Sequence, residues 1–188
     1  MQGIWGWLAL AGVALVLGAS IYLYNRLVFN RARVAEAWSG IEVQLKRRAS
    51  LIPNLLVCLK AYMAHERATL ESLAQLRGMA QAHAADGVAV RSNVEGRLST
   101  ALAQVFVLVE GYPELKADAA FVDLQGNLVD SEEQIQMARR YYNGAVRELN
   151  VLVESVPSNL LARAFGFHSA AYFSLDERSQ AQAPKLEL

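Results

Sequence analysis

The sequence lacks several features that would identify a function directly. It contains a single cysteine, Cys58, which excludes an internal disulfide and a cysteine-rich zinc site and is typical of a reducing compartment. Its 18 basic and 18 acidic residues leave no net charge, whereas nucleic-acid-binding proteins usually carry a basic domain or stripe. We therefore expect no nucleic-acid partner.

Charge is also absent from the first 25 residues, and this absence is the most informative. The uncharged run from Ile4 to Tyr24 has about 21 residues, so as a helix it would extend roughly 31 Å and match a bilayer core of about 30 Å. Trp5 and Trp7 near one end and Tyr22 near the other are typical of interfacial belts. The alternative, a cleaved signal peptide, needs a basic n-region and a shorter apolar stretch. The sequence favours a retained transmembrane anchor over residues 1–25.

The charges that flank this anchor predict its orientation. Between Arg26 and Arg48 there are six lysines or arginines against two acidic residues, while the other flank carries only the terminal amine. By the positive-inside rule, we expect the N-terminus outside and the rest of the chain in the cytoplasm.

The remainder of the chain has the periodicity of helices. The longest stripe alternates spacings of three and four over about five heptads, which is typical of a packed helix and incompatible with a strand. Its members are Phe121, Leu124, Leu128, Ser131, Ile135, Ala138, Tyr142, Ala145, Leu149, Leu152 and Val156. Three shorter stripes run from Val34 to Leu45, from Leu55 to Leu76 and from Val94 to Tyr112. We predict an all-α domain over residues 26–175, in which an apolar segment near residues 160–173 packs back, followed by a disordered tail over 176–188.

Local signals predict where the helices end. Pro113 disfavours helical geometry in the residue before it, so the helix of the Val94 stripe should end near Gly111. Asp118 can then cap the next helix through its side chain. The segment 83–88 indicates another turn, and the pair 157–158 should end the last long helix.

Pro53 leaves two alternatives open. The stripes on either side of it are in phase, which suits one long, kinked helix. An interior proline costs about 3 kcal/mol, however, and Ser50 is a good cap for a new helix with Pro53 in its first turn. We favour a break near Ala49 and Ser50, which gives four helices.

The search for catalytic or metal-binding patterns is largely negative. His65 and Glu66 begin like a zinc-protease helix, but Thr69 stands where the second histidine is required. His83 and His168 are distant in sequence, and Glu132 lies on the polar side of the long heptad helix, where a solvated face is the ordinary interpretation. We predict no catalytic residue, no metal, no cofactor and no small-molecule substrate.

Two basic segments exceed what a plain bundle requires. Lys46, Arg47 and Arg48 form the first, and Arg139 and Arg140 form the second. They are candidate contacts for an acidic partner or for lipid phosphates, although a solvated charge cluster beside a helix junction explains them equally well. On a straight, upright helix the triplet lies more than about 30 Å from the anchor, well beyond a Debye length of about 8 Å, which favours a protein partner.

A series of motifs resembles the LemA family and covers nearly the whole chain in order. They are Tyr24-Asn25-Arg26-Leu27-Val28, Ala37-Trp38 with Ile41, Val43-Gln44-Leu45-Lys46-Arg47-Arg48, Leu51-Ile52-Pro53-Asn54-Leu55, Tyr62 with His65-Glu66, Tyr112-Pro113-Glu114-Leu115-Lys116-Ala117, Leu124-Gln125, Arg139-Arg140-Tyr141-Tyr142-Asn143 with Val146, and Pro157-Ser158-Asn159-Leu160 with Gly166-Phe167. Ser50 departs from the family, which usually has an acidic residue there.

The resemblance implies a bacterial inner-membrane protein with one transmembrane helix and a cytoplasmic, antiparallel up-and-down four-helix bundle. It supplies no reaction and no binding residues. Genes of this family often lie near an HtpX-type membrane metalloprotease, which suggests by association a role in membrane-protein quality control. We favour a non-catalytic scaffold or adaptor that binds another membrane protein or its own copies. The alternatives are a self-assembling, membrane-shaping protein that contacts anionic lipid and, less favoured, a hydrolase.

Overall fold

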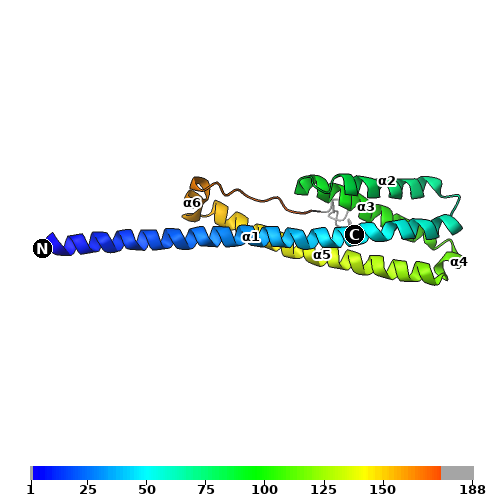
Figure 1. The fold of residues 1–188 in the computed structure, drawn as a ribbon, viewed down its shortest axis with the longest axis horizontal. Coiled ribbons are helices and arrows are strands. Elements are labelled where there is room, and N and C mark those ends of the chain that lie inside the picture. Colours follow the sequence, from blue (N-terminus) through cyan, green and yellow to red (C-terminus); the bar gives the residue numbers. More distant parts are fainter. Residues whose placement is uncertain (1, 175–188) are drawn as a thin grey trace, which may run out of the picture. The chain divides into compact units, whose positions relative to one another are not determined.

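The computed structural model describes residues 2–174, and the tail expected over 176–188 lies outside them. The described residues form helices and no strand, which confirms the all-α class (Figure 1). In chain order the helices are α1 (Gln2–Tyr62), α2 (Arg67–Ala82), α3 (Val88–Val109), α4 (Pro113–Lys116), α5 (Ala119–Glu154) and α6 (Ser158–Ala164).

The chain divides into two compact units. Of the described residues, the first unit contains 2–39 and 141–171, and the second contains 40–140 and 172–174. The helices α1 and α5 each contribute residues to both units. The two units are described separately below.

The apolar start of α1 has the properties expected of a membrane anchor. Among the described residues, α1 is the one helix long and apolar enough to cross a membrane. Its described side chains between Trp5 and Ala19 are exposed, so nothing in the described chain covers them. Trp5 is 74% exposed and Leu15 is 72% exposed. An exposed apolar run of this length indicates burial by something other than the chain itself.

The helix α1 continues past Pro53, so the predicted break near Ala49 and Ser50 is wrong. Proline has no N–H to donate to the carbonyl four residues earlier, which here belongs to Ala49. Arg77 of α2 supplies the missing donor, because its Nε lies 3.2 Å from the Ala49 oxygen. Ser50 caps no new helix, and its hydroxyl instead donates to the Arg47 carbonyl at 2.7 Å. The side chain of Arg77 thus compensates for the proline.

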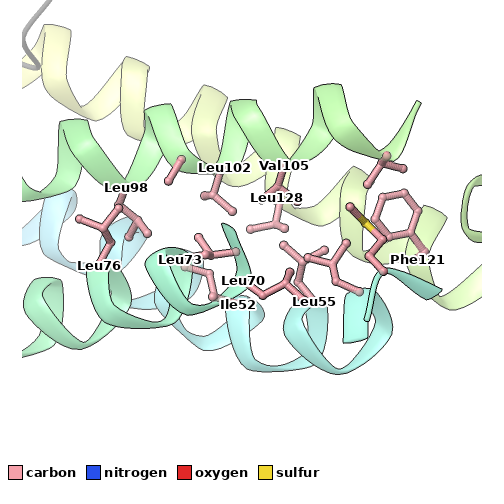
Figure 2. Packing of buried hydrophobic residues seen from close by; sticks show 14 of the residues in the cluster. Ile52, Leu55, Leu70, Leu73, Leu76, Leu98, Leu102, Val105, Phe121 and Leu128 are labelled. Atoms are coloured by element: carbon pink, nitrogen blue, oxygen red, sulfur yellow. The ribbon is translucent and has the colours of Figure 1, made fainter. Parts of the chain in front are cut away.

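The core of the second unit confirms two of the shorter stripes in outline, those from Leu55 to Leu76 and from Val94 to Tyr112 (Figure 2). Ile52 and Leu55 of α1 belong to the same buried cluster as Leu73 of α2 and Leu98 of α3. The remaining members are Leu59, Met63, Leu70, Leu76, Ala80, Val94, Ala101, Leu102, Val105, Val109, Leu115, Phe121 and Leu128. Burial of one face of each helix in a common cluster is what the spacing of three and four predicts.

The first unit has a smaller core of its own. Leu27 of α1 packs with Leu149 and Leu152 of α5, and Ala162 of α6 and Phe167 complete the cluster. The predicted return of the C-terminal segment is therefore confirmed for its described part in this unit. The members of the α5 stripe are buried as far as Leu152, except that Leu124 and Ala138 are half-buried. Val156, beyond the end of the helix, is 80% exposed.

The predicted helix ends are also confirmed. Asp118 caps α5, because its Oδ1 accepts hydrogen bonds from the backbone N–H groups of Ala120 at 2.8 Å and Phe121 at 3.1 Å. The segment 83–87 connects α2 to α3, and α3 ends at Val109, before Pro113. The long helix α5 ends at Glu154, three residues before Pro157.

Candidate docking surface and buried arginine cluster

The basic triplet separates into two exposed residues and one buried residue. Arg48 is 1% exposed, and its Nη2 lies 2.6 Å from Glu95 Oε2 of α3. Its Nη1 lies 2.6 Å from Glu132 Oε2 of α5 and 2.6 Å from Ser99 Oγ. Arg48 therefore belongs to a buried ion-pair cluster that joins three helices, and its guanidinium is not exposed for docking as the sequence predicted.

A planar guanidinium suits this position. A buried charge is costly unless it is paired and hydrogen-bonded, and the fork of an arginine can serve two carboxylates at once. The prediction that Glu132 lies on a solvated face is wrong, because its half-buried carboxylate accepts a hydrogen bond from Arg48. Glu95, which sequence reasoning did not single out, is buried. Glu95 lies three residues before Leu98 and seven before Leu102, so it shares the buried side of α3, and this spacing is the signal that could have found it.

A second buried cation lies in the same unit. Arg91 of α3 is 2% exposed, its Nη1 lies 2.9 Å from Glu42 Oε1 of α1, and the same nitrogen donates to the Ala84 carbonyl at 2.6 Å. Arg91 therefore ties the start of α3 both to α1 and to the turn after α2. No sequence motif marked this arginine, because its acidic partner lies 49 positions away along the chain.

Lys46 and Arg47 lie on an exposed face of α1 in the second unit. The neighbouring exposed residues Val43, Ser50, Asn54 and Val57 recur at the three- and four-residue spacings that place side chains on one side of a helix. We call these six residues the basic face of α1. It combines two cations with two largely exposed valines, and the structure therefore leaves it accessible to a partner.

The second basic pair lies on α5 and divides in a similar way. Arg140 is exposed, whereas Arg139 is half-buried and has an interacting neighbour within the protein. Arg140 thus remains a candidate surface contact, whereas Arg139 interacts with another residue of the protein.

The histidines occupy unrelated positions. His65 and His168 are exposed, and His83 lies in the turn after α2, with its Nδ1 2.5 Å from Asp86 Oδ2. In the part of the chain that the structure describes, no group of three or more His, Cys, Asp or Glu side chains is placed to hold a metal ion.

Tyr62 of α1 and Asp118, the residue that caps α5, shift each other's pKa. Tyr62 donates its hydroxyl to Asp118 Oδ2 at 2.9 Å. The backbone N–H of Phe121 and then the Tyr62 hydroxyl stabilise the carboxylate and hold the pKa of Asp118 below its usual range. The same hydrogen bond raises the pKa of Tyr62, because the phenol is favoured over the phenolate.

Over the described residues, the fold defines an all-α protein with one helix that is long and apolar enough to cross a membrane. The chain belongs to the LemA family, whose sequence model matches residues 37–188. This confirms the resemblance that the motifs indicated.

Named relatives support the assignment. Protein LemA of Metamycoplasma hominis is 24% identical over 181 residues, which cover 93% of this chain and 81% of that protein. Magnetosome protein MamQ of Magnetospirillum gryphiswaldense is 24% identical over 175 residues, which cover 80% of this chain and 64% of that protein. Magnetosome protein MamQ 2 of Paramagnetospirillum magneticum is 32% identical over 79 residues, which cover 42% of this chain and only 29% of the relative.

Proposed function

We propose that this protein is a non-catalytic, single-pass membrane adaptor whose helical bundle binds a second membrane protein or further copies of itself. The observation that carries the proposal is the basic face of α1, where Lys46 and Arg47 are exposed while the adjacent Arg48 is held inside by two carboxylates. A cationic helix face flanked by valines suits a partner helix with acidic and apolar side chains. The HtpX-type metalloprotease suggested by the family resemblance is one candidate partner.

The proposed topology places the N-terminus outside the bacterial inner membrane and the up-and-down bundle in the cytoplasm. The support is the exposed apolar start of α1, followed by the arginines at 26, 31 and 33. In that arrangement the basic face of α1 is presented to cytoplasmic parts of neighbouring membrane proteins.

The test is chemical crosslinking of the full chain in intact membranes. We expect the wild type to give a discrete crosslinked complex, and Lys46→Glu combined with Arg47→Glu to abolish it, because like charges would then oppose an acidic partner. Mass spectrometry of the crosslinked species distinguishes a self-association from a separate partner.

A matched control is available in the same unit. Arg67→Glu combined with Arg97→Glu makes the same change in charge at two exposed residues of α2 and α3, outside the basic face of α1. This control should retain the complex. A complex that survives reversal at Lys46 and Arg47, or is lost equally in both double variants, would contradict the proposed surface.

A second candidate is a membrane-shaping protein that assembles on anionic lipid. The arginine-rich stretch after the apolar run favours it. This function predicts that the purified full chain, without any partner, deforms reconstituted vesicles seen by electron microscopy. The adaptor function predicts smooth vesicles under the same conditions.

A further inference from the structure

A basic groove lies in the first unit, immediately after the apolar run. It has a volume of about 480 Å³ and is lined from α1 by Arg26, Phe29, Asn30 and Arg33 and from α5 chiefly by Arg147 and Glu148. The four α1 residues fall at three- and four-residue spacings, so one face of the helix forms one wall. Neither basic segment of the sequence includes a residue of this groove, and Arg147 lies more than a hundred residues from the four α1 residues.

The cations of the groove are not balanced by its single acid. Glu148 Oε2 lies 2.6 Å from Arg33 Nη1, so that pair is satisfied. Asn30 donates its side-chain amide to the Arg26 carbonyl at 2.8 Å. Within residues 2–174, the guanidinium groups of Arg26 and Arg147 have no hydrogen-bonded or ion-paired neighbour, and both line the same groove. Two unpaired guanidinium groups at one cavity suit a bound phosphate ester.

The sequence position of the groove matches the depth of lipid headgroups. Arg26 and Arg33 follow Tyr24, the end of the apolar run, by two and nine residues, which is about 3 and 14 Å along a helix. The headgroup layer on each side of a bilayer core is roughly 5–8 Å thick. Arginine side chains are long enough to reach back from a helix to that layer.

Aromatic contacts place other parts of the first unit at the same level. The ring of Tyr24 packs edge-on against Phe165, with centroids 4.9 Å apart, and against Phe167 at 5.9 Å. Phe29, at the groove, is 60% exposed. An exposed aromatic ring beside unpaired arginines is the combination expected where a surface meets both headgroups and acyl chains.

We propose that this groove binds the headgroup of an anionic phospholipid, with the phosphate held by Arg26 and Arg147. The proposal depends on the membrane insertion contained in the proposed function. It does not depend on a protein partner or on the basic face of α1. A soluble phosphate anion offers the same chemistry, but it gives no reason for the exposed Phe29 or for the position beside the apolar run.

The test uses the full chain, purified in nonionic detergent micelles that contain phosphatidylglycerol or phosphatidylcholine. Native mass spectrometry then measures the lipid retained by the protein. We expect preferential retention of phosphatidylglycerol, and a loss of about tenfold in Arg147→Gln, because a charge-assisted hydrogen bond is removed. Arg26→Gln, which removes the other unpaired guanidinium, should give a similar loss.

Arg163→Gln is the matched control, because Arg163 is an exposed arginine of α6 in the same unit that does not line the groove. It should leave retention unchanged. Equal losses in Arg147→Gln and Arg163→Gln, or no preference between the two lipids, would overturn the proposal. Displacement of the lipid by added inorganic phosphate would assign the groove to a soluble anion instead. Carbonate extraction of membranes, done in parallel, shows whether the protein is inserted in the bilayer. If the protein stays in the membrane but does not retain the lipid, only the proposed groove is wrong.

Discussion

At the scale of single residues, Arg48 shows how misleading a run of adjacent basic residues can be. Lys46 and Arg47 face outward, while the next side chain along the helix turns into the interior and meets Glu95 and Glu132. The rotation of about 100° per residue in a helix makes this division unavoidable for three consecutive positions. A buried charge of this kind specifies which helices must meet, since only the correct packing supplies both carboxylates.

Removal of Arg48 should therefore be among the most destabilising single changes in the second unit. Arg48→Ala leaves Glu95 buried without its counter-ion, which we expect to lower the free energy of unfolding by about 3–5 kcal/mol. Urea unfolding of the full chain in detergent, followed by far-UV circular dichroism, measures this. Lys46→Ala should change it by no more than about 0.5 kcal/mol. Equal effects of the two substitutions would show that Arg48 is not buried in its ion pairs.

Asp118 should give a defined acid dependence of stability. Its pKa is lowered in the folded chain, so its contribution is fully present above the unfolded value of about 3.9 and is lost as the pH falls through the lower folded value. Asn at this position keeps a capping oxygen but removes the charge. The stability gap between wild type and Asp118→Asn should be constant at neutral pH and shrink below about pH 4. A gap that widens in acid would contradict the assigned direction.

At the scale of elements, the continuity of α1 depends on a residue from another helix. Pro53 removes one backbone hydrogen bond of α1 and leaves the Ala49 carbonyl without its helical donor. Arg77 of α2 donates to that carbonyl instead. Packing on both sides of the proline, through Ile52 and Leu55, keeps the helix in register. Tertiary contacts thus offset a local preference for a break.

This compensation predicts that substitutions at Pro53 and Arg77 are not independent in their effects on stability. Arg77→Ala should destabilise the chain by about 1–3 kcal/mol, because the Ala49 carbonyl loses its donor. In a Pro53→Ala background, the restored backbone N–H can serve that carbonyl, so the same substitution should cost less. A double-mutant cycle of urea unfolding measures the difference. Arg97→Ala, at an exposed arginine of α3, is the control, and strictly additive effects of Pro53→Ala and Arg77→Ala would contradict the compensation.

Elements could be predicted from the sequence wherever the signal was local. The stripe of α5, the cap at Asp118 and the turn over 83–87 depend on residues within a few positions of one another, and all of them are confirmed. The ion pairs of Arg48 and the hydrogen bond of Arg77 join residues 28 to 84 positions apart. No single-sequence pattern specifies such pairings, which explains why Pro53 and Glu132 were misjudged.

At the scale of the whole molecule, the helix α1 combines an apolar segment suited to a membrane with a cationic face suited to a partner. The first part of α1 is apolar and exposed, as an anchor requires, and its later part carries exposed cations in the second unit. The chain belongs to the LemA family, and the proposed adaptor role and the proposed orientation both depend on α1. Orientation is the more fundamental of the two, because it determines which partners the basic face of α1 can meet.

Site-directed labelling with a membrane-impermeant thiol reagent tests that orientation most directly. In a Cys58→Ala background, a cysteine at Gln2 should react in intact cells whose outer membrane has been made permeable. A cysteine at Gln134, an exposed position of α5, should react only after the inner membrane is also lysed. Labelling of the Gln134→Cys chain before lysis, with the Gln2→Cys chain protected, would contradict the account.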